Sequence, residues 1–183
     1  LPAGRNNPKR PVIIYLHAGG FYSVTSRSNR AGPHYLMDQD IVLVTLNYRL
    51  GTLGFLSIGK EAPGNNGLRD QVLAMKWVQN NIASFGGDPN SVTLYGYSSG
   101  SRSTTLHIVS PMSRGLFHKA ILGSGSALGH WHMPTNQLDL AKRQARIVGC
   151  PDDNATVVID CLRKTPAEEL ANSFFQLTVS KSI

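Results

Sequence analysis

Hydrophobic residues in this chain are grouped in short continuous runs, and between the runs lie segments with helical periodicity. The runs have the length and continuity of strands that are covered on both faces. They are found at 11–16, 41–46, 91–95 and 119–122. Apolar residues recur at steps of three and four from Leu68 to Ile82 and again from about Pro134 to Val148, which predicts two helices. Strands that alternate with helices indicate an α/β fold with a mostly parallel central sheet flanked by helices.

Breaks in these patterns locate the ends of the first helix. Asn65 or Asn66 supplies a cap before it, and Gly86-Gly87 with Pro89 ends it. The stretch 48–66 is rich in Gly, Asn and Pro, and we expect a long loop there. No repeat or convincing domain boundary is found, so residues 1–183 are interpreted as one domain.

Composition narrows the class of protein. Of the 183 residues 41% are hydrophobic and 16% are charged, which is typical of a globular chain. No stretch approaches the ~20 apolar residues of a membrane span. The chain begins at Leu1, so we expect an interior or processed piece of a longer protein. The net charge of +7 comes from scattered basic residues, and the cluster at 142–146 is interpreted as a solvated helix face, not a nucleic-acid site.

The clearest chemical motif follows the third strand. Residues 96–100 match G-x-S-x-G, with a strand before the motif and a plausible helix after it. Gly96 and Gly100 leave room for a sharp turn that lifts the hydroxyl of Ser98 off the sheet. The N–H groups at the start of the following helix face the negative charge that develops in acyl transfer. This context indicates a nucleophilic serine.

A glycine-rich loop directly after the first strand strengthens that interpretation. His17-Ala18-Gly19-Gly20-Phe21 offers backbone N–H groups without bulky side chains, as an oxyanion hole requires. Either motif alone also fits an ordinary glycine turn. Together, and in this order along the chain, they favour an α/β-hydrolase.

A longer series of motifs resembles the type-B carboxylesterase/cholinesterase family of α/β-hydrolases, with an insect-type carboxylesterase character, over nearly the whole chain. The matching segments besides the G-x-S-x-G motif are 15–23, 47–51, 54–56, 64–71, 85–89, 116–117 and 124–126. The resemblance implies a partial α/β-hydrolase fold, truncated at both ends. It implies Ser98 as the catalytic nucleophile and the N–H groups of Gly19, Gly20 and Ser99 as the oxyanion hole. It also places Trp131 at a position that lines the substrate pocket, although Trp131 by itself fits a simple core or surface aromatic better.

Departures from the family pattern bear on the substrate. Ala18 stands where many relatives have the first of three glycines, and it leaves both donor positions intact. Tyr97 replaces the acidic residue that precedes the serine in cholinesterases. An uncharged residue at this place favours neutral carboxyl esters over choline esters.

The two cysteines do not have the spacing of a zinc site, and we expect no metal. By themselves Cys150 and Cys161 fit either two buried free thiols or a disulfide. A glycosylation sequon begins at Asn154 between them, and the related family has a short disulfide loop that ends in a sequence like Cys161-Leu162-Arg163. A disulfide, N-glycosylation at Asn154, and a secreted or lumenal location are therefore expected.

The order of acidic residues and histidines excludes a complete triad in this chain. The fold requires serine, then acid, then histidine. No Asp or Glu lies between Ser98 and His132, and no histidine follows His132. We therefore expect a fragment of a serine carboxylesterase that acts on a small-molecule ester through an acyl-enzyme and without a cofactor, and the fragment alone to be inactive. The alternative is a catalytically inactive, cholinesterase-like adhesion module, and the oligomeric state is left open.

Overall fold

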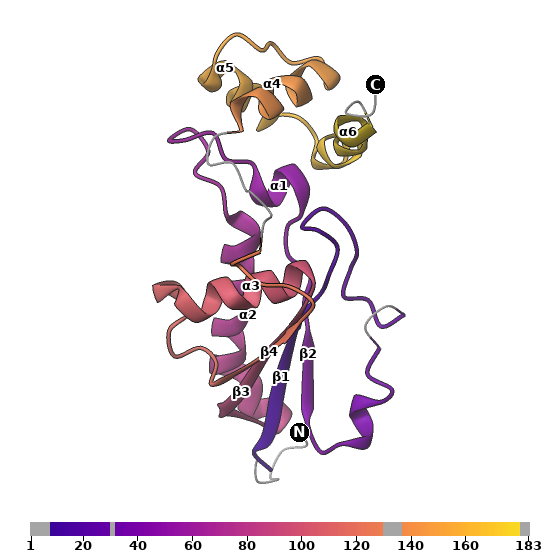
Figure 1. Cartoon of the computed structure of the whole chain (residues 1–183), viewed down its shortest axis with the longest axis vertical. Coiled ribbons are helices and arrows are strands. Elements are labelled where there is room, and N and C mark those ends of the chain that lie inside the picture. Colours follow the sequence, from indigo (N-terminus) through magenta and orange to yellow (C-terminus); the bar gives the residue numbers. More distant parts are fainter. Residues whose placement is uncertain (1–7, 30–31, 130–136, 180–183) are drawn as a thin grey trace. The chain divides into compact units, whose positions relative to one another are not determined.

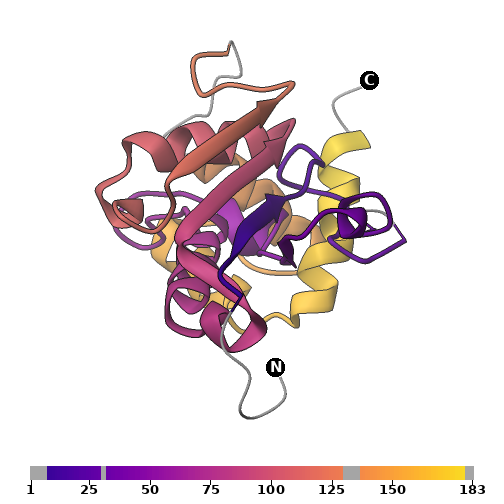
Figure 2. The same cartoon turned by 90° about the horizontal axis from the view of Figure 1, so that it is seen from below.

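Four parallel strands form the sheet that organises residues 8–48 and 68–129. The computed structural model describes residues 8–29, 32–129 and 137–179. The strands are β1 (Arg10–Leu16), β2 (Val42–Thr45), β3 (Gly87–Tyr97) and β4 (Lys119–Gly123). Their spatial order is β2-β1-β3-β4, and their arrows point the same way in Figure 2. The α/β class and all four predicted strands are confirmed, but β4 is exposed from Lys119 to Leu122, so its prediction as a strand covered on both faces is wrong.

Two helices pack against this sheet. They are α2 (Asn66–Asn81) and α3 (Ser99–Val109), both labelled beside the strands in Figure 1. The single-turn helices η1 (Leu36–Asp38), η2 (Ile82–Phe85) and η3 (Pro111–Ser113) complete this part. Helix α2 begins where the sequence predicts, and η2 ends at Gly86 in the left-handed conformation with φ of 85°.

The core of the sheet lies under α2. Alternate side chains of β1 and β3 point to one face and meet the apolar stripe of α2, because strand and helix periodicities each collect apolar residues on one side. The buried members are Val12, Ile14, Leu16, Val92 and Leu94 of the strands with Val72, Met75, Val78 and Ile82. Burial of such side chains contributes roughly 1.5–3 kcal/mol each, which makes this cluster the main support of the sheet.

Residues 49–67 and 137–179 form a second compact unit, which is helical. Its helices are α1 (Gly51–Phe55), α4 (Leu138–Ile147), α5 (Ala155–Leu162) and α6 (Ala167–Val179). They enclose a separate buried cluster. Its members are Ile58, Ala141, Ala145, Cys150, Val158, Ile159, Leu162 and Leu170.

The disulfide predicted between Cys150 and Cys161 is confirmed in this helical unit, with Cα atoms 5.9 Å apart. It joins the end of the turn after α4 to the last turn of α5. The side chain of Asn154 caps α5 by accepting a hydrogen bond from the N–H of Val157 at 3.1 Å. The disulfide and the Asn154 cap therefore both stabilise α5.

The helical unit differs from the sequence prediction, which does not include α1, α5 or α6. The stretch 48–66 is not loop throughout, because α1 occupies Gly51–Phe55. A helix of 5 residues that contains two glycines has no propensity signal. The structure places the second predicted helix at Leu138–Ile147, while residues 134–136 lie outside the described part of the chain. In the described ranges no helix is long and apolar enough to cross a membrane.

Candidate active site at the ends of two parallel strands

Ser98 lies at the turn between β3 and α3 in a strained backbone conformation. Its φ is 54° and its ψ is −116°, a region that residues other than glycine rarely adopt. A Cβ on Gly96 would overlap the carbonyl oxygen of Gly100, and a Cβ on Gly100 would overlap the carbonyl oxygen of Leu16. Both glycines of the motif are therefore required by the tightness of the turn, as the sequence predicts.

The strained turn is held from both sides by backbone contacts. The N–H of Ser98 donates to the carbonyl oxygen of Gly123 at the end of β4, at 2.7 Å. The carbonyl oxygen of Ser98 accepts from the N–H of Arg102 at 3.0 Å, which starts the hydrogen-bond ladder of α3. A Cβ on Gly125 would overlap the same carbonyl oxygen. The surrounding structure thus fixes the position from which the serine side chain leaves the sheet.

The glycine loop follows β1, the strand beside β3. Gly19, Gly20 and Phe21 have φ values of 119°, 61° and 68°, so three consecutive residues adopt left-handed backbone. A Cβ on Gly19 would overlap the carbonyl oxygen of Ser23, which makes glycine obligatory there. The carbonyl oxygen of Gly19 accepts from the N–H groups of Tyr22 and Ser23 at 3.0 and 2.9 Å. These bonds close the loop into a tight turn.

The parallel pairing of β1 with β3 brings the loop and the serine turn to the same edge of the sheet. Leu16, the last residue of β1, pairs with Gly96. In the described ranges neither the N–H of Gly19 nor that of Gly20 is bound to a protein acceptor. Two unused donors therefore lie on the loop that follows the neighbouring strand.

Ser99 lies at the first position of α3. Its side chain is buried, and the first N–H groups of a helix have no partner within the helix. They carry the positive end of the helix dipole, which favours an anion at this place. The site thus combines a serine hydroxyl with backbone donors from two elements.

The described histidines beyond Ser98 do not bond to it. His107 lies buried in α3, where its Nδ1 meets the hydroxyl of Ser113 at 2.7 Å and its Nε2 meets Oε1 of Gln71 at 2.8 Å. Burial lowers the pKa of His107 to about 4. His118 lies just before β4, where its Nδ1 accepts from the N–H of Val92 at 3.3 Å. Both rings are used in structural contacts.

The predicted pocket residue Trp131 lies outside the described residues.

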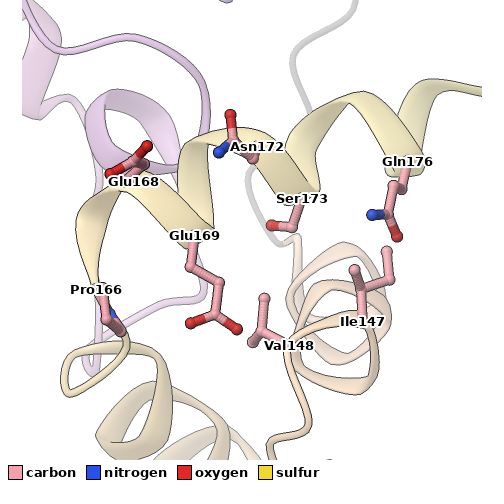
Figure 3. A pocket seen from close by; sticks show the side chains of 8 residues that line it. All are labelled: Ile147, Val148, Pro166, Glu168, Glu169, Asn172, Ser173 and Gln176. Carbon is pink, nitrogen blue, oxygen red and sulfur yellow. The ribbon is translucent and has the colours of Figure 1, made fainter.

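A surface pocket of about 440 Å³ lies in the helical unit. It is lined by residues at the end of α4 and along α6, including Val148 and Glu169, and by none of the residues assigned to chemistry (Figure 3). Within the described ranges no three His, Cys, Asp or Glu side chains gather as a metal site requires. His17 has no predicted role, although it is a polar side chain that follows an apolar strand directly and is only 2% exposed.

A parallel sheet with a strained serine between strand and helix matches part of an α/β-hydrolase fold. The model of the carboxylesterase family matches residues 1–183, and the chain belongs to that family. It is 50% identical over 165 residues to esterase FE4 of Myzus persicae, covering 89% of this chain and 29% of the relative. It is 46% identical over 178 residues to a juvenile hormone esterase of Tribolium castaneum, covering 94% and 30%. With cholinesterase 1 of Branchiostoma lanceolatum it shares 46% identity over 165 residues, covering 87% and 46%. The chain thus spans about 30% of the length of the first two relatives.

Proposed function

We propose that the full-length protein containing this chain is a serine carboxylic ester hydrolase. Ser98 attacks the ester carbonyl, the alcohol leaves, and water then releases the acid from the acyl-enzyme. The observation that carries the proposal is the backbone of Ser98, strained at the end of β3 beside a glycine loop with unused donors. Strain of this kind persists only where the surrounding structure maintains it, and it gathers at functional sites.

The backbone donors have a separate role in the proposal. The carbonyl oxygen becomes an oxyanion when Ser98 attacks, and the N–H groups of Gly19, Gly20 and Ser99 stabilise that charge. Removal of one such donor typically lowers kcat by about 10²–10³. Membership of the carboxylesterase family supports this assignment.

The base and its acidic partner are proposed to lie in the part of the protein outside this chain. No acidic residue separates Ser98 from the histidines that follow it, so the required order of serine, acid and histidine is absent here. We therefore expect the 183-residue piece to hydrolyse esters negligibly. Turnover of a short-chain ester by the purified piece, abolished by Ser98→Ala, would contradict this assignment.

We further propose neutral esters as the substrate class, with Trp131 lining the acyl pocket. Tyr97 is uncharged, whereas a carboxylate before the serine would attract a quaternary ammonium group. The measurement compares kcat/KM for a choline ester and its uncharged carbon isostere. A tenfold preference for the choline ester, about 1.4 kcal/mol, would overturn the substrate assignment.

Secretion and glycosylation belong to the same proposal. The disulfide between Cys150 and Cys161 fits an oxidising compartment. Asn154 is exposed at the start of α5, and its Oδ1 caps the helix while Nδ2 stays available for a glycan. Deglycosylation that converts residue 154 to Asp, detected by peptide mass, is the expected result for secreted material.

The direct test of the nucleophile is covalent labelling of the full-length protein. We expect diisopropyl fluorophosphate to modify Ser98 and Ser98→Ala to lose labelling and turnover. Ser28→Ala, at an exposed serine of the same unit, serves as the matched control and keeps both. A labelled peptide that lacks Ser98 would contradict the proposal, and a protein that is neither labelled nor active would favour the adhesion module.

A further inference from the structure

His17 directly follows the last residue of β1, and its side chain makes one hydrogen bond to the backbone of the glycine loop. Its Nδ1 lies 2.6 Å from the carbonyl oxygen of Ala18. A carbonyl oxygen only accepts, so Nδ1 carries the proton and donates. Burial lowers the pKa of His17, which keeps the ring neutral in this tautomer. The direction of the bond is therefore fixed.

The bond to Ala18 also fixes the direction of the next N–H. The described chain contains no cis peptide bond, so the Ala18–Gly19 peptide is trans, and its C=O and N–H point to opposite sides of one plane. When His17 holds the carbonyl oxygen of Ala18, the N–H of Gly19 is turned away from the imidazole. This N–H is one of the two unused donors of the loop.

The second donor is fixed in a different way. The carbonyl oxygen of Gly19 accepts from two backbone N–H groups and from the hydroxyl of Ser23, so the Gly19–Gly20 peptide is held by the turn itself. Ala18 has no such backbone support among the described residues, and the hydrogen bond recorded on its carbonyl oxygen comes from His17. The direction of the Gly19 N–H thus depends on a side chain.

Tyr48 holds the imidazole in place. Its ring stacks on His17 with centroids 4.5 Å apart and planes 15° from parallel, and its hydroxyl donates to the backbone oxygen of His17 at 3.1 Å. Burial raises the pKa of Tyr48 to about 12, so the hydroxyl remains a donor. Nε2 of His17 has no hydrogen-bond partner among the described residues, so the recorded contacts that orient the ring are the Ala18 bond and the stack.

We propose that His17, held by Tyr48, is a positioning residue that sets the direction of the Gly19 N–H and so completes the oxyanion hole. The inference rests on the proposed function, because an oxyanion must form for the direction of this donor to affect the rate. His17 touches neither the ester nor Ser98 in this scheme. Its effect is confined to the transition state, in which the carbonyl oxygen carries negative charge.

The experiment uses the full-length protein with p-nitrophenyl acetate as substrate and a trifluoromethyl ketone as probe. The ketone forms a tetrahedral adduct with an active serine and therefore reports the oxyanion hole apart from turnover. For His17→Leu we expect kcat per labelled Ser98 to fall about 10- to 100-fold, with KM nearly unchanged and ketone affinity lost in parallel. His17→Asn keeps a short amide donor for the carbonyl oxygen of Ala18 and should recover most of the loss.

Tyr48→Phe provides a milder test that keeps the stack and removes one hydroxyl. We expect a loss of a few fold in kcat and in ketone affinity, smaller than for His17→Leu. The matched controls are His34→Leu and Tyr35→Phe, at exposed positions of the same unit, and they should leave both quantities unchanged. Thermal unfolding of every variant shows whether a change reflects lost protein or lost transition-state binding.

The outcomes separate this inference from the proposed function. A wild-type protein without labelling of Ser98 or turnover would overturn the function itself. An active wild-type protein whose His17→Leu variant keeps kcat per labelled site and ketone affinity would overturn only the role of His17, as would equal losses in His17→Asn and His17→Leu. If His17→Leu does not fold, Tyr48→Leu decides, because it removes the ring stack that orients the imidazole, and unchanged ketone affinity there would overturn the inference.

Discussion

The sheet unit and the helical unit are stabilised by different means. In the sheet unit a layer of apolar side chains lies under α2, and the buried polar groups include a titratable histidine, His107. The helical unit has a smaller apolar cluster, a disulfide, and the uncharged amide of Gln144 as its buried polar centre. The unit that carries the candidate chemistry therefore has a stability that depends on pH, whereas that of the helical unit depends on redox conditions.

The two buried polar centres show this contrast in detail. Gln144 accepts from the hydroxyl of Thr52 at 2.6 Å, and its amide donates to the carbonyl oxygen of Leu170 and the hydroxyl of Ser173 at 3.0 and 2.8 Å. It joins α1, α4 and α6 without carrying a charge at any pH. His107 joins α3 to α2 and η3 in a similar way, but it can bind a proton.

The largest effect is expected where β1 meets α3. In Gly100→Ala the new Cβ overlaps the backbone oxygen of Leu16, and neither backbone can move without disturbing the serine turn. We expect a loss of more than about 4 kcal/mol, enough to prevent folding of the full-length protein. Expression yield and circular dichroism check this. A folded variant that keeps labelling of Ser98 would show that the turn is less constrained than the structure indicates.

The pH dependence of the sheet unit is the next largest effect. The pKa of His107 is about 4 in the folded protein and about 6.5 in the unfolded chain. Between these pH values the unfolded chain binds a proton that the folded protein does not bind. The stabilisation is fully present above pH 6.5 and falls as pH decreases from 6.5 to 4, by up to about 3 kcal/mol. Urea unfolding of the full-length protein at several pH values measures the slope.

Two variants sharpen this test. His107→Gln should reduce the slope between pH 4 and 6.5, because the titrating group is gone. Gln144→Leu should lower stability by a similar amount at every pH, because it removes hydrogen bonds without changing a charge. An unchanged slope in His107→Gln would assign the pH dependence to other groups.

Loss of the disulfide should affect the helical unit. A closed loop with a sequence separation of 11 restrains the unfolded chain, and its removal in the Cys150→Ser, Cys161→Ser double variant should cost about 2–3 kcal/mol. Hydrogen exchange is expected to rise in 138–179 and to change little in 87–109. Equal increases in both ranges would mean that the two units unfold together.

The smallest effect is expected for replacement of an unpacked glycine by alanine, and it should have the same size in both units. Gly149 of the helical unit and Gly115 of the sheet unit have φ values of 71° and 75°, and a Cβ at either meets nothing within 4 Å. Their replacement by Ala costs only backbone strain, about 1–2 kcal/mol in each case. Thermal unfolding of the two variants should give similar shifts. A much larger shift at one position would reveal packing that the glycine geometry does not show.

Local sequence determined the strands and the serine turn. The four apolar runs mark the strands, of which β1 and β3 supply the buried core while β4 is exposed, and Gly96 and Gly100 fit a turn with no space for a Cβ. Helix α5 was not predicted from the sequence, because Thr156, Val157 and Ile159 are β-branched and disfavour a helix. Helix α5 is stabilised by the Asn154 cap, the disulfide and core packing, none of which depends on the helix propensity of its residues.

Tertiary structure decided which of these elements lie together. The order β2-β1-β3-β4 brings the loop after β1 next to the turn after β3, although Gly20 and Ser98 are 78 positions apart in the sequence. It also brings Tyr48, from the segment after β2, onto the ring of His17. Periodicity specifies which face of each strand is buried, but neighbouring strands are selected by packing between distant segments, so these contacts arise only in the folded chain.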